Sequence, residues 1–335
     1  MYTRYLVTGA TGFLGRTVVE ALVKQGAEVY ALVLYQDPLM LYLPEGVHVV
    51  VGDVTSRASL ELFFAAADRR TCVIHCAGIV SLATNPGLDL YHVNVGGTLE
   101  IVRQCLAHSV GKLVYVSSVH AIPSVPKGTA VTETDVFSPA LVDGDYAESK
   151  ATATEIVFAA VERGLNASVV FPSGIIGPGD RSGGAMSAMI EAFLAGRLPF
   201  AVSGGHDFAD VRDVAAGILS CAESGEAGKG YILSGHYITL RRLLCRVRKA
   251  ARRRLPFICL PMPLARLAAP WCERHCRKKG KPLFFTPYSV AVLSSGARYS
   301  REAAGNHLGY SPRPMEVTLR DMTRWVLGED EILPF

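Results

Sequence analysis

Long apolar runs are absent from this sequence of 335 residues. No stretch of 18 uninterrupted apolar residues occurs, so no transmembrane helix is predicted. Met1 leads almost directly into an apolar run at Tyr5, which leaves no room for a signal peptide, so we expect a cytoplasmic protein. Half of the residues are hydrophobic, which permits a substantial core and argues against disorder.

Paired cysteine motifs are lacking as well. The eight cysteines are scattered through apolar and helical segments, as expected of reduced, buried side chains. Cys272, His275 and Cys276 are neighbours in the sequence, but a cluster of three without a second pair usually arises by chance. No metal site is therefore predicted.

Acidic residues are scarce in the last third of the chain. From residue 236 onward there are 19 Lys and Arg against 7 Asp and Glu, whereas residues 1–235 hold 15 against 23. The run 241–254 contains eight basic residues and no acid. On a helix that buries its leucines, these charges would form a solvated face. Peripheral contact with an anionic membrane is the alternative, and no motif indicates nucleic acid.

An alternation of apolar runs and helical patterns fills the first two thirds of the chain. Continuous Val- and Ile-rich runs separated by helices are typical of a parallel sheet covered on both faces. We therefore predict an α/β fold with a doubly wound parallel (Rossmann) sheet, whose ligand lies at the carboxyl ends of the strands. The strands are expected at 4–8, 28–34, 47–51, 72–75, 112–116, 167–171 and 230–233, and the helices near 14–25, 58–66, 90–108, 147–163 and 211–222.

The first of these strands runs into a turn with three glycines, Gly9, Gly12 and Gly15, and a helical pattern follows. The first glycine permits a tight turn, and the second lets the backbone approach a pyrophosphate. The third lets the helix pack closely on the strand. Although the spacing departs from G-x-G-x-x-G, the order of strand, turn and helix predicts a dinucleotide site.

That site divides the chain into two parts. Residues 1–171 are expected to form the dinucleotide-binding Rossmann domain, to which 207–235 return. Residues 172–206 leave the sheet as a wall over the site, and with 236–330 they are expected to form a smaller, mostly C-terminal substrate-binding lobe.

A clear signal for the adenosine ribose is missing after the second strand. No acid ends the strand, and no Lys or Arg occurs between 27 and 46. Arg16 in the glycine turn is the nearby cation for the 2′-phosphate of NADP, and Asp37 would reach the ribose of NAD only by bending back. We favour NAD(H) over NADP(H).

Beyond the fifth strand, which ends in Ser117-Ser118, the sequence contains Tyr146 and Lys150. If Tyr146 begins a helix, Lys150 is one turn on and on the same face. A phenol of pKa ~10 is a poor acid–base at neutral pH, and a nearby ammonium lowers that pKa. A serine hydroxyl would hold the substrate oxygen during proton transfer. Taken alone, Y-x-x-x-K also suits the surface of an amphipathic helix.

Together these motifs resemble the extended short-chain dehydrogenase/reductases. Asn94 adds to the likeness, and the segment 171–180, Phe-Pro-Ser-Gly-Ile-Ile-Gly-Pro-Gly-Asp, narrows it. The chain is most similar to the branch of dihydroflavonol 4-reductase and 3β-hydroxysteroid dehydrogenase, and to the related hopanoid-associated epimerase-like proteins. The likeness extends over nearly the whole chain, including the segment 308–313.

The resemblance implies a role for each matching residue. Tyr146 would be the acid–base, and Lys150 would bind the nicotinamide ribose and tune Tyr146. Ser118 (or Ser117) would position the carbonyl, and Asn94 would support the site. The cofactor contacts would be Gly9, Thr11, Gly12, Phe13, Leu14 and Gly15 in the glycine turn, Asp53 and Val54 at the adenine, and Ala77, Gly78, Lys150, Pro172 and Ser173 at the nicotinamide.

The implied activity is a nicotinamide-dependent oxidoreductase that interconverts a secondary alcohol and a ketone. Sugar dehydratases of the family carry Asp-Glu directly after the site hydroxyl, whereas Val119-His120 follows here, which disfavours dehydration. A nucleotide-sugar epimerase using the same Tyr–Lys pair is the alternative. A dinucleotide-binding redox sensor fits less well, because such relatives have typically lost the pair.

The expected pocket segments, 79–90, 119–145, 172–206 and 256–290, are mostly apolar. The first three contain Lys127, Arg181 and Arg197 as their cations, too few to pair a buried diphosphate. We therefore expect a small-molecule substrate of steroid, flavonoid or aryl ketone type, bound by burial of its apolar surface. The sequence is compatible with a monomer and with a homodimer.

Overall fold

The computed structural model describes residues 2–84, 87–126, 128–281 and 283–329; Lys127 and the predicted lobe boundary at 330 lie outside them. Seven parallel strands form one sheet in the order β11-β7-β5-β4-β1-β2-β3, which confirms the predicted Rossmann-like fold. Each predicted strand is present to within one residue. They are β1 (Arg4–Thr8), β2 (Glu28–Val33), β3 (His48–Val51), β4 (Thr71–His75), β5 (Lys112–Val116), β7 (Ala167–Pro172) and β11 (Gly230–Leu233).

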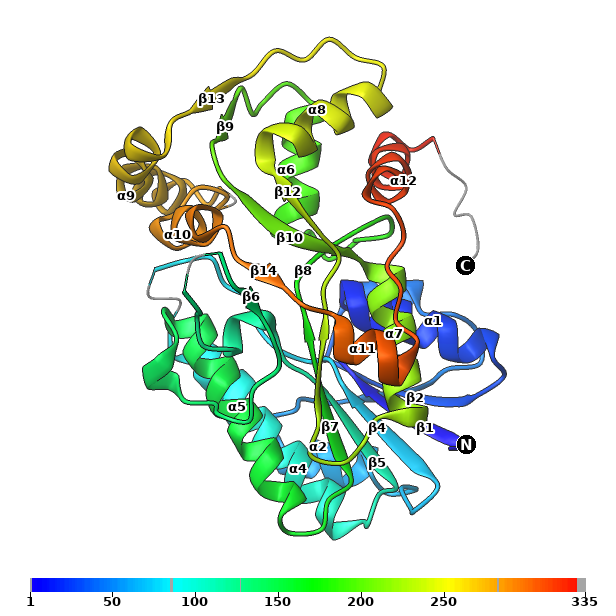
Figure 1. Cartoon of the computed structure of the whole chain (residues 1–335). Helices are drawn as coiled ribbons and strands as arrows, with labels where there is room; N and C mark the ends of the chain where they lie inside the picture. The colour runs from blue at the N-terminus through cyan, green and yellow to red at the C-terminus, as the bar shows by residue number, and fades with distance from the viewer. Residues whose placement is uncertain (1, 85–86, 127, 282, 330–335) are drawn as a thin grey trace.

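Helices cover both faces of this sheet (Figure 1). On one face, α1 (Phe13–Lys24), α7 (Val211–Ser224) and α11 (Glu302–Leu308) pack in one core with Val7. On the other, α2 (Arg57–Phe63), α4 (Thr98–Ala107) and α5 (Asp145–Val161) pack in a second core with Leu6. Successive strand residues point to opposite faces, so runs that are apolar at every position supply both cores.

The helix expected at 90–108 is interrupted. It consists of α3 (Leu88–Tyr91), one stretch of π-helix, η2 (His92–Gly97), and α4. A π-helical turn often marks a functional site. Here it buries Asn94, whose side chain bonds to the backbone of Ile79 instead of facing solvent.

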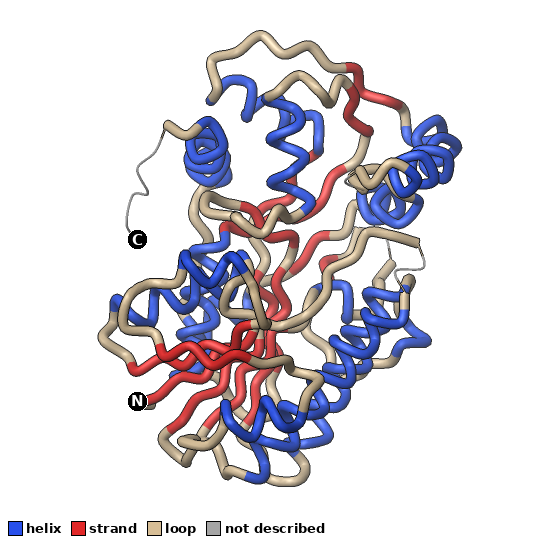
Figure 2. Tube along the Cα trace, turned by 180° about the vertical axis from the view of Figure 1, so that it is seen from behind, coloured by secondary structure: helices blue, strands red, loops and turns tan. Residues whose placement is uncertain are grey.

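The rest of the chain lies over the carboxyl ends of the large sheet (Figures 1 and 2). A three-stranded sheet of order β12-β10-β8 and a separate hydrophobic core build it. Because β10 pairs with β8 and β12, the chain returns to the large sheet at α7. The elements are β8 (Gly174–Ile176), α6 (Ala185–Leu194), β9 (Phe200–Val202), β10 (Gly205–Asp210), β12 (His236–Thr239), α8 (Leu240–Ala250), β13 (Ile258–Leu260), α9 (Met262–Lys278), α10 (Pro287–Ser295), β14 (Arg298–Tyr299) and α12 (Met315–Leu327).

Four short elements complete the fold: η1 (Pro38–Tyr42), η3 (Val119–Ala121), β6 (Ala130–Val131), which pairs with β14, and η4 (Pro139–Leu141). No helix among the described residues is both long and apolar enough to cross a bilayer.

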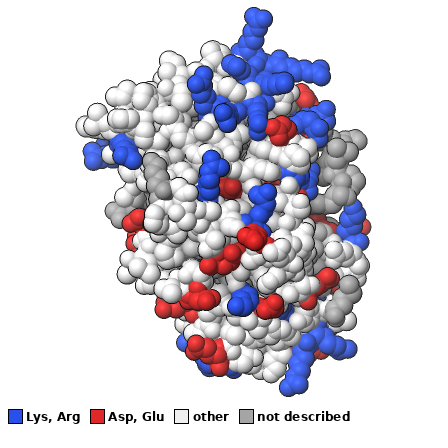
Figure 3. Space-filling model, in the orientation of Figure 1, with Lys and Arg blue, Asp and Glu red and all other residues white. Residues whose placement is uncertain are grey.

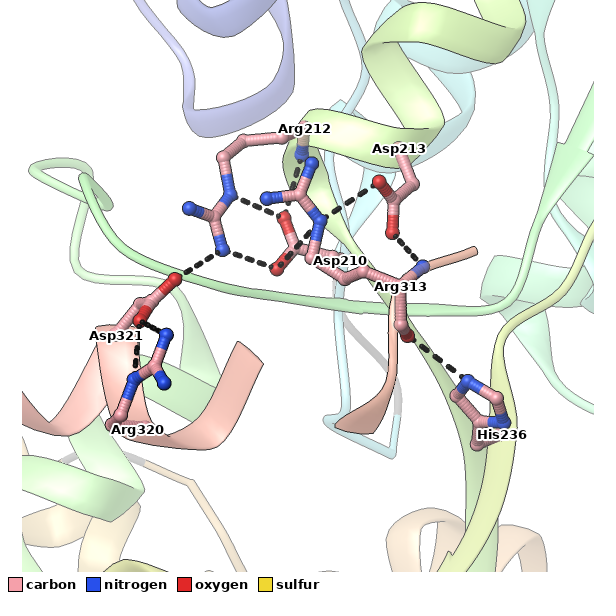
Figure 4. Close-up of polar contacts among 7 residues, drawn as sticks. All are labelled: Asp210, Arg212, Asp213, His236, Arg313, Arg320 and Asp321. Carbon is pink, nitrogen blue, oxygen red and sulfur yellow. Dashed lines mark hydrogen bonds and ion pairs between the residues drawn. The ribbon is translucent and has the colours of Figure 1, made fainter. Parts of the chain in front are cut away.

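An ion-pair network joins the start of α7 to the last part of the chain (Figure 4). Arg212 binds both carboxylate oxygens of Asp210, at 2.9 and 2.8 Å, and also pairs with Asp321 of α12 at 3.0 Å. The Arg313 guanidinium pairs with Asp213 at 2.8 Å, and its backbone N–H donates to the same carboxylate at 2.7 Å. These contacts fix β10, α7 and α12 relative to one another.

Candidate active site

Backbone contacts hold the glycine turn closed. Gly9 has a φ of +64°, and a Cβ on it would lie 2.7 Å from Ala77 N. A Cβ on Gly15 would lie 2.0 Å from Gly9 O, so α1 begins directly on the strand ends. Gly12 occupies the N-cap and has no side chain to cap the first N–H groups of the helix. This arrangement fits the pyrophosphate of a dinucleotide.

A buried chain of hydrogen bonds runs beneath the turn. Thr8 Oγ1 accepts from Ala77 N at 3.2 Å and lies 2.7 Å from His75 Nδ1. On the other side of the ring, His75 Nε2 lies 3.1 Å from Thr98 Oγ1, which donates to Asn94 O. Burial lowers the pKa of His75 to about 3, so this histidine is a neutral core residue that joins two strand ends to η2.

The two groups considered for the adenosine ribose differ in their surroundings. Asp37 does bend back, because Thr11 Oγ1 donates to Asp37 Oδ2 at 2.6 Å. Arg16 is buried, pairs with Glu20 and donates to Gly179 O. A carboxylate therefore stands at the glycine turn, while the nearby guanidinium is already bound by the protein.

The structure also describes the remaining residues expected to contact the cofactor. Phe13 and Leu14 of the glycine turn open α1. After β3, Asp53 accepts from Thr55 N and Thr55 Oγ1, both at 2.8 Å, which fixes the loop. Val54 beside it is buried.

The expected nicotinamide side combines small residues with a poorly bonded hydroxyl. A Cβ on Gly78 would lie 3.3 Å from Lys150 Nζ, so Ala77-Gly78 brings backbone close to the lysine. Pro172 ends β7, and the Ser173 hydroxyl that follows is buried and forms no hydrogen bond of standard geometry with the described residues, although it lies near enough to Asp207 to offset part of the rise that burial causes in the pKa of that carboxyl. A buried hydroxyl that is poorly bonded is costly. The residues present thus fit a nicotinamide cofactor at this strand end.

Tyr146 and Lys150 lie one turn apart at the start of α5, and both are buried. Lys150 Nζ donates to Val116 O at 2.9 Å and to Tyr115 OH at 3.4 Å. The predicted helix therefore places the pair at the carboxyl end of β5, where the ligand of such a sheet is expected.

The structure separates the two serines that follow β5. Ser117 Oγ lies 2.7 Å from Thr154 Oγ1 and faces the body of α5. Ser118 caps η3 and hydrogen-bonds to Tyr146. Of the two candidates, Ser118 is the one that shares a site with the tyrosine.

Burial sets the protonation of the pair. It raises the pKa of Tyr146, which the hydrogen bond from Ser118 partly offsets. It also lowers the pKa of Lys150 to about 8, against the opposing effect of the Cys76 thiol. The expected lowering of the Tyr146 pKa by Lys150 is not found in the chain itself, because the ammonium points to a carbonyl and to a second phenol. Tyr146 is a protonated phenol at neutral pH.

Asn94 positions the helix that carries this pair. Its amide donates to Ile79 O and Ser149 Oγ, both at 3.0 Å, and Asn94 Oδ1 accepts from Ile79 N at 2.7 Å. Ser149 in turn donates to Tyr146 O at 2.8 Å. Asn94 thus links the strand end near residue 79 to the first turn of α5.

Comparison with known proteins agrees with this geometry. A family model, "NAD dependent epimerase/dehydratase family", matches residues 5–234. The chain belongs to this family. As a member it is an enzyme of the extended short-chain dehydrogenase/reductase type, as the motifs predicted.

Individual relatives of this family member match it over almost their whole length. "Sterol demethylase protein B" of Methylococcus capsulatus is 30% identical over 96% of this chain and 97% of its own. "Putative dihydroflavonol 4-reductase" of Synechocystis is 29% identical over 96% and 94%. The crystal structure of gox2253 has a TM-score of 0.83 at 29% identity, covering 97% of this chain and 98% of that one.

In this family member a group of aromatic rings faces Tyr146, and its members come from three of the segments that were expected to line the pocket. His120 lies 6.0 Å from the Tyr146 ring and stacks on His206 at 5.6 Å. The hydroxyl of Tyr288, on α10, lies 3.4 Å from His120 Nδ1. The closeness of His120 to Ser118 was the available signal, and it was used only to disfavour dehydration.

His206 is the most enclosed member of this ring cluster. It is 6% exposed, and its Nδ1 atom has no hydrogen-bond partner among the described residues. Burial lowers the pKa of His120 to about 4 and that of His206 to about 3. Both imidazoles are neutral, and His206 Nδ1 is the ring nitrogen left to bond a polar group, because His120 Nδ1 faces the Tyr288 hydroxyl.

The predicted pocket cations do not gather around Tyr146. The Arg181 guanidinium lies over the Tyr42 ring at 4.2 Å, on the side of α1, and Arg197 is exposed. Within the part of the chain that the structure describes, no three or more His, Cys, Asp or Glu residues could together hold a metal.

Proposed function

We propose that this enzyme interconverts a secondary alcohol and a ketone on a largely apolar substrate, with Tyr146 as acid–base. The observation that carries the proposal is the wall opposite Tyr146. It consists of the neutral rings of His120, His206 and Tyr288. Such a wall suits a ring or hydrocarbon, whereas a buried diphosphate needs paired cations.

Each site residue has its own role in the proposed reaction. Ser118 and Tyr146 hold the substrate oxygen between two hydroxyls. In reduction, the Tyr146 phenol donates its proton to the carbonyl oxygen, and in oxidation it takes the proton back. The bound nicotinamide supplies or accepts the hydride. Lys150 binds the nicotinamide ribose, while Asn94 keeps α5 in place.

NAD(H) is the proposed cofactor in preference to NADP(H). The hydrogen bond from Thr11 holds the Asp37 carboxylate beside the glycine turn, where it would accept from a ribose hydroxyl and repel a 2′-phosphate. Arg16, the candidate reader of that phosphate, is engaged by Glu20 and Gly179.

The names of relatives support an apolar substrate. Besides the sterol demethylase protein, a "Sterol-4-alpha-carboxylate 3-dehydrogenase" of Schizosaccharomyces pombe is 26% identical over 96% of this chain. From these names we take only the proposed substrate class for this enzyme, which is a steroid, flavonoid or aryl ketone. Peripheral membrane contact through 241–254, a homodimer and a cytoplasmic location stay predictions.

A nucleotide-sugar epimerase remains the second candidate, because the family contains epimerases and the Tyr–Lys pair serves both reactions. The test is a panel of hydroxysteroids, flavonoids and aryl ketones beside UDP-hexoses, followed by nicotinamide absorbance and by calorimetry. We expect turnover of an apolar alcohol or ketone. Micromolar binding of a UDP-sugar, with no response to any apolar compound, would replace the proposal by the epimerase.

A further inference from the structure

The outer face of α9 is apolar although nothing in the described structure covers it. Leu264, Leu267 and Trp271 stand three and four residues apart, which puts them on one face of the helix. They are 56%, 72% and 72% exposed. These side chains lie in the segment 256–290 that was expected to line the pocket, but they face outward. Contiguous exposed apolar surface of this kind marks an interaction site.

The opposite face of α9 already provides its attachment to the protein. Ala265, Ala269 and Glu273 are buried there. The Glu273 carboxylate accepts from Thr84 N at 2.8 Å and pairs with Arg277 at 2.7 Å. The outer residues are therefore free for another purpose.

The strand beside α9 extends the apolar face. β13 pairs with β9, and the paired residues Ile258 and Phe200 are 63% and 50% exposed. Between β13 and α9 lies a hollow of about 440 Å³. It is lined by Leu260, Leu264, Leu267, Ala268, Trp271 and Cys272.

A basic hollow of about 680 Å³ lies across β13 from the apolar one. Its lining includes Arg241, Arg242 and Arg246 of α8 together with Cys259. Cys259 and Leu260 are consecutive strand residues, so the two hollows flank the same strand. Within the described chain, Arg241 and Arg242 have no ion-pair partner, whereas Arg246 pairs with Glu316.

Basic residues outnumber acidic ones on this part of the molecule. Figure 3 shows Lys and Arg gathered over α8 and the loop that follows, beside a largely uncharged region over β9 and β13, with further basic side chains at α9. From 236 to 281 the sequence contains a single acid, the inward-facing Glu273. Arg274 and Lys278 continue the exposed stripe of Trp271 along α9.

We propose that the outer face of α9, the β9–β13 pair and the basic face of α8 form a docking surface for an anionic lipid bilayer. Apolar side chains with an exposed Trp suit the interfacial layer, and the flanking arginines suit anionic headgroups. A second copy of the same face would bring like charges together, and a nucleic acid would leave the leucines in water.

The docking surface is connected to the active site through α9 and α10. Glu273 on the inner face of α9 holds Thr84, and Thr286 at the start of α10 donates to Leu82 O at 2.6 Å. Tyr288 in the next turn belongs to the ring cluster over Tyr146. The surface stands without the proposed function, but an apolar substrate dissolved in the bilayer would arrive beside the pocket.

The test uses the full-length protein and vesicles of phosphatidylcholine, alone or mixed with phosphatidylglycerol. We expect cosedimentation with the anionic vesicles only, and weaker binding as salt rises. Leu267→Asp and the pair Arg241→Glu/Arg242→Glu should each lower partitioning at least about tenfold. In a Trp325→Phe background, the Trp271 fluorescence should shift to the blue on binding.

Matched controls separate docking from unfolding. Leu62 is 71% exposed on the dinucleotide domain, so Leu62→Asp should bind vesicles like the unmodified protein. Arg57→Glu/Arg163→Glu changes charge equally on that domain and should also bind normally. Vesicle binding needs no turnover, so it can succeed or fail independently of the substrate assay.

Three outcomes would overturn the proposal. The first is no binding to anionic vesicles by a folded protein. The second is binding that Leu267→Asp leaves unchanged, which would indicate a basic patch alone. The third is an oligomer that Leu267→Asp dissociates, with no vesicle binding, which would make the face a contact between copies.

Discussion

The two sides of the active site are built in different ways. On the cofactor side, short motifs set the geometry through the backbone, as where a Cβ on Gly15 would meet Gly9 O at 2.0 Å. On the substrate side, His120 and Tyr288 meet across 168 residues of sequence. The first kind of site can be read from spacing, whereas the second depends on how the lobe packs over the sheet.

The largest effect should come from Tyr146, where the two sides meet. Tyr146→Phe removes the proton donor and should lower turnover by about 10²–10⁴, while cofactor affinity stays nearly unchanged. Tyr91→Phe is the matched control. The Tyr91 hydroxyl bonds to Glu148, which lies on α5 like Tyr146, but Tyr91 is exposed. Near-normal turnover of Tyr146→Phe, with chemistry rate-limiting, would remove Tyr146 from its role.

Gly15→Ala tests the backbone-defined side. The added methyl group would lie against Gly9 O, so we expect a loss of about 1–3 kcal/mol in the free energy of unfolding and weaker binding of NAD. Gly96→Ala places its Cβ 3.7 Å from the nearest side chain and should change little. If Gly15→Ala and Gly96→Ala had the same free energy of unfolding in urea and the same affinity for NAD, the backbone contacts of Gly15 would not determine the geometry of the cofactor side.

Acid should weaken the packing-defined side. Burial lowers the pKa of His120 to about 4 and of His206 to about 3, against about 6.5 in the unfolded chain. Below 6.5 the unfolded chain binds more protons. The contribution of these two neutral rings to the free energy of unfolding is therefore complete above pH 6.5. It is lost as the pH falls toward 4.

Between pH 7 and pH 5, the free energy of unfolding should fall by about 1–2 kcal/mol for each of these histidines. In the variant His120→Gln/His206→Gln that loss should shrink, whereas it should persist in His48→Gln, whose ring is exposed. Urea unfolding at the two pH values measures it. If the free energy of unfolding of the double variant fell between pH 7 and pH 5 as much as that of the unmodified protein, neither ring would be buried in solution.

The smallest effect concerns cofactor choice. Asp37→Ser should reduce the preference for NAD over NADP by about tenfold, because the carboxylate beside the glycine turn is removed. Asp68→Ser, which removes a half-buried loop carboxylate from the same domain, is the control. A preference of tenfold or more for NADP in the unmodified protein would instead assign the reading to Arg16 or to a more distant residue.

The same division explains what the sequence could predict. The seven strands follow from continuous apolar runs, the glycine turn from a spacing of three and the Tyr146–Lys150 pair from a spacing of four, all of which are local patterns. His206 and Tyr288 lie in loosely patterned segments of the lobe. Their approach to His120 and Tyr146 depends on how β10 and α10 pack in the fold, and no spacing in the sequence indicates that. The π-helical turn was not predicted, since no local pattern marks it; its residue Asn94 bonds to Ile79, fifteen residues away.

The network of Figure 4 has a consequence for how the polypeptide is made. Asp213 leaves the ribosome one hundred residues before Arg313, the partner that binds it twice. Until Arg313 has been synthesised, the Asp213 carboxylate in the first turn of α7 is bound by water. In the complete protein the Arg313 guanidinium binds it instead. We expect the large sheet to form during synthesis and α7 to settle on it only when Arg313 and α12 have emerged.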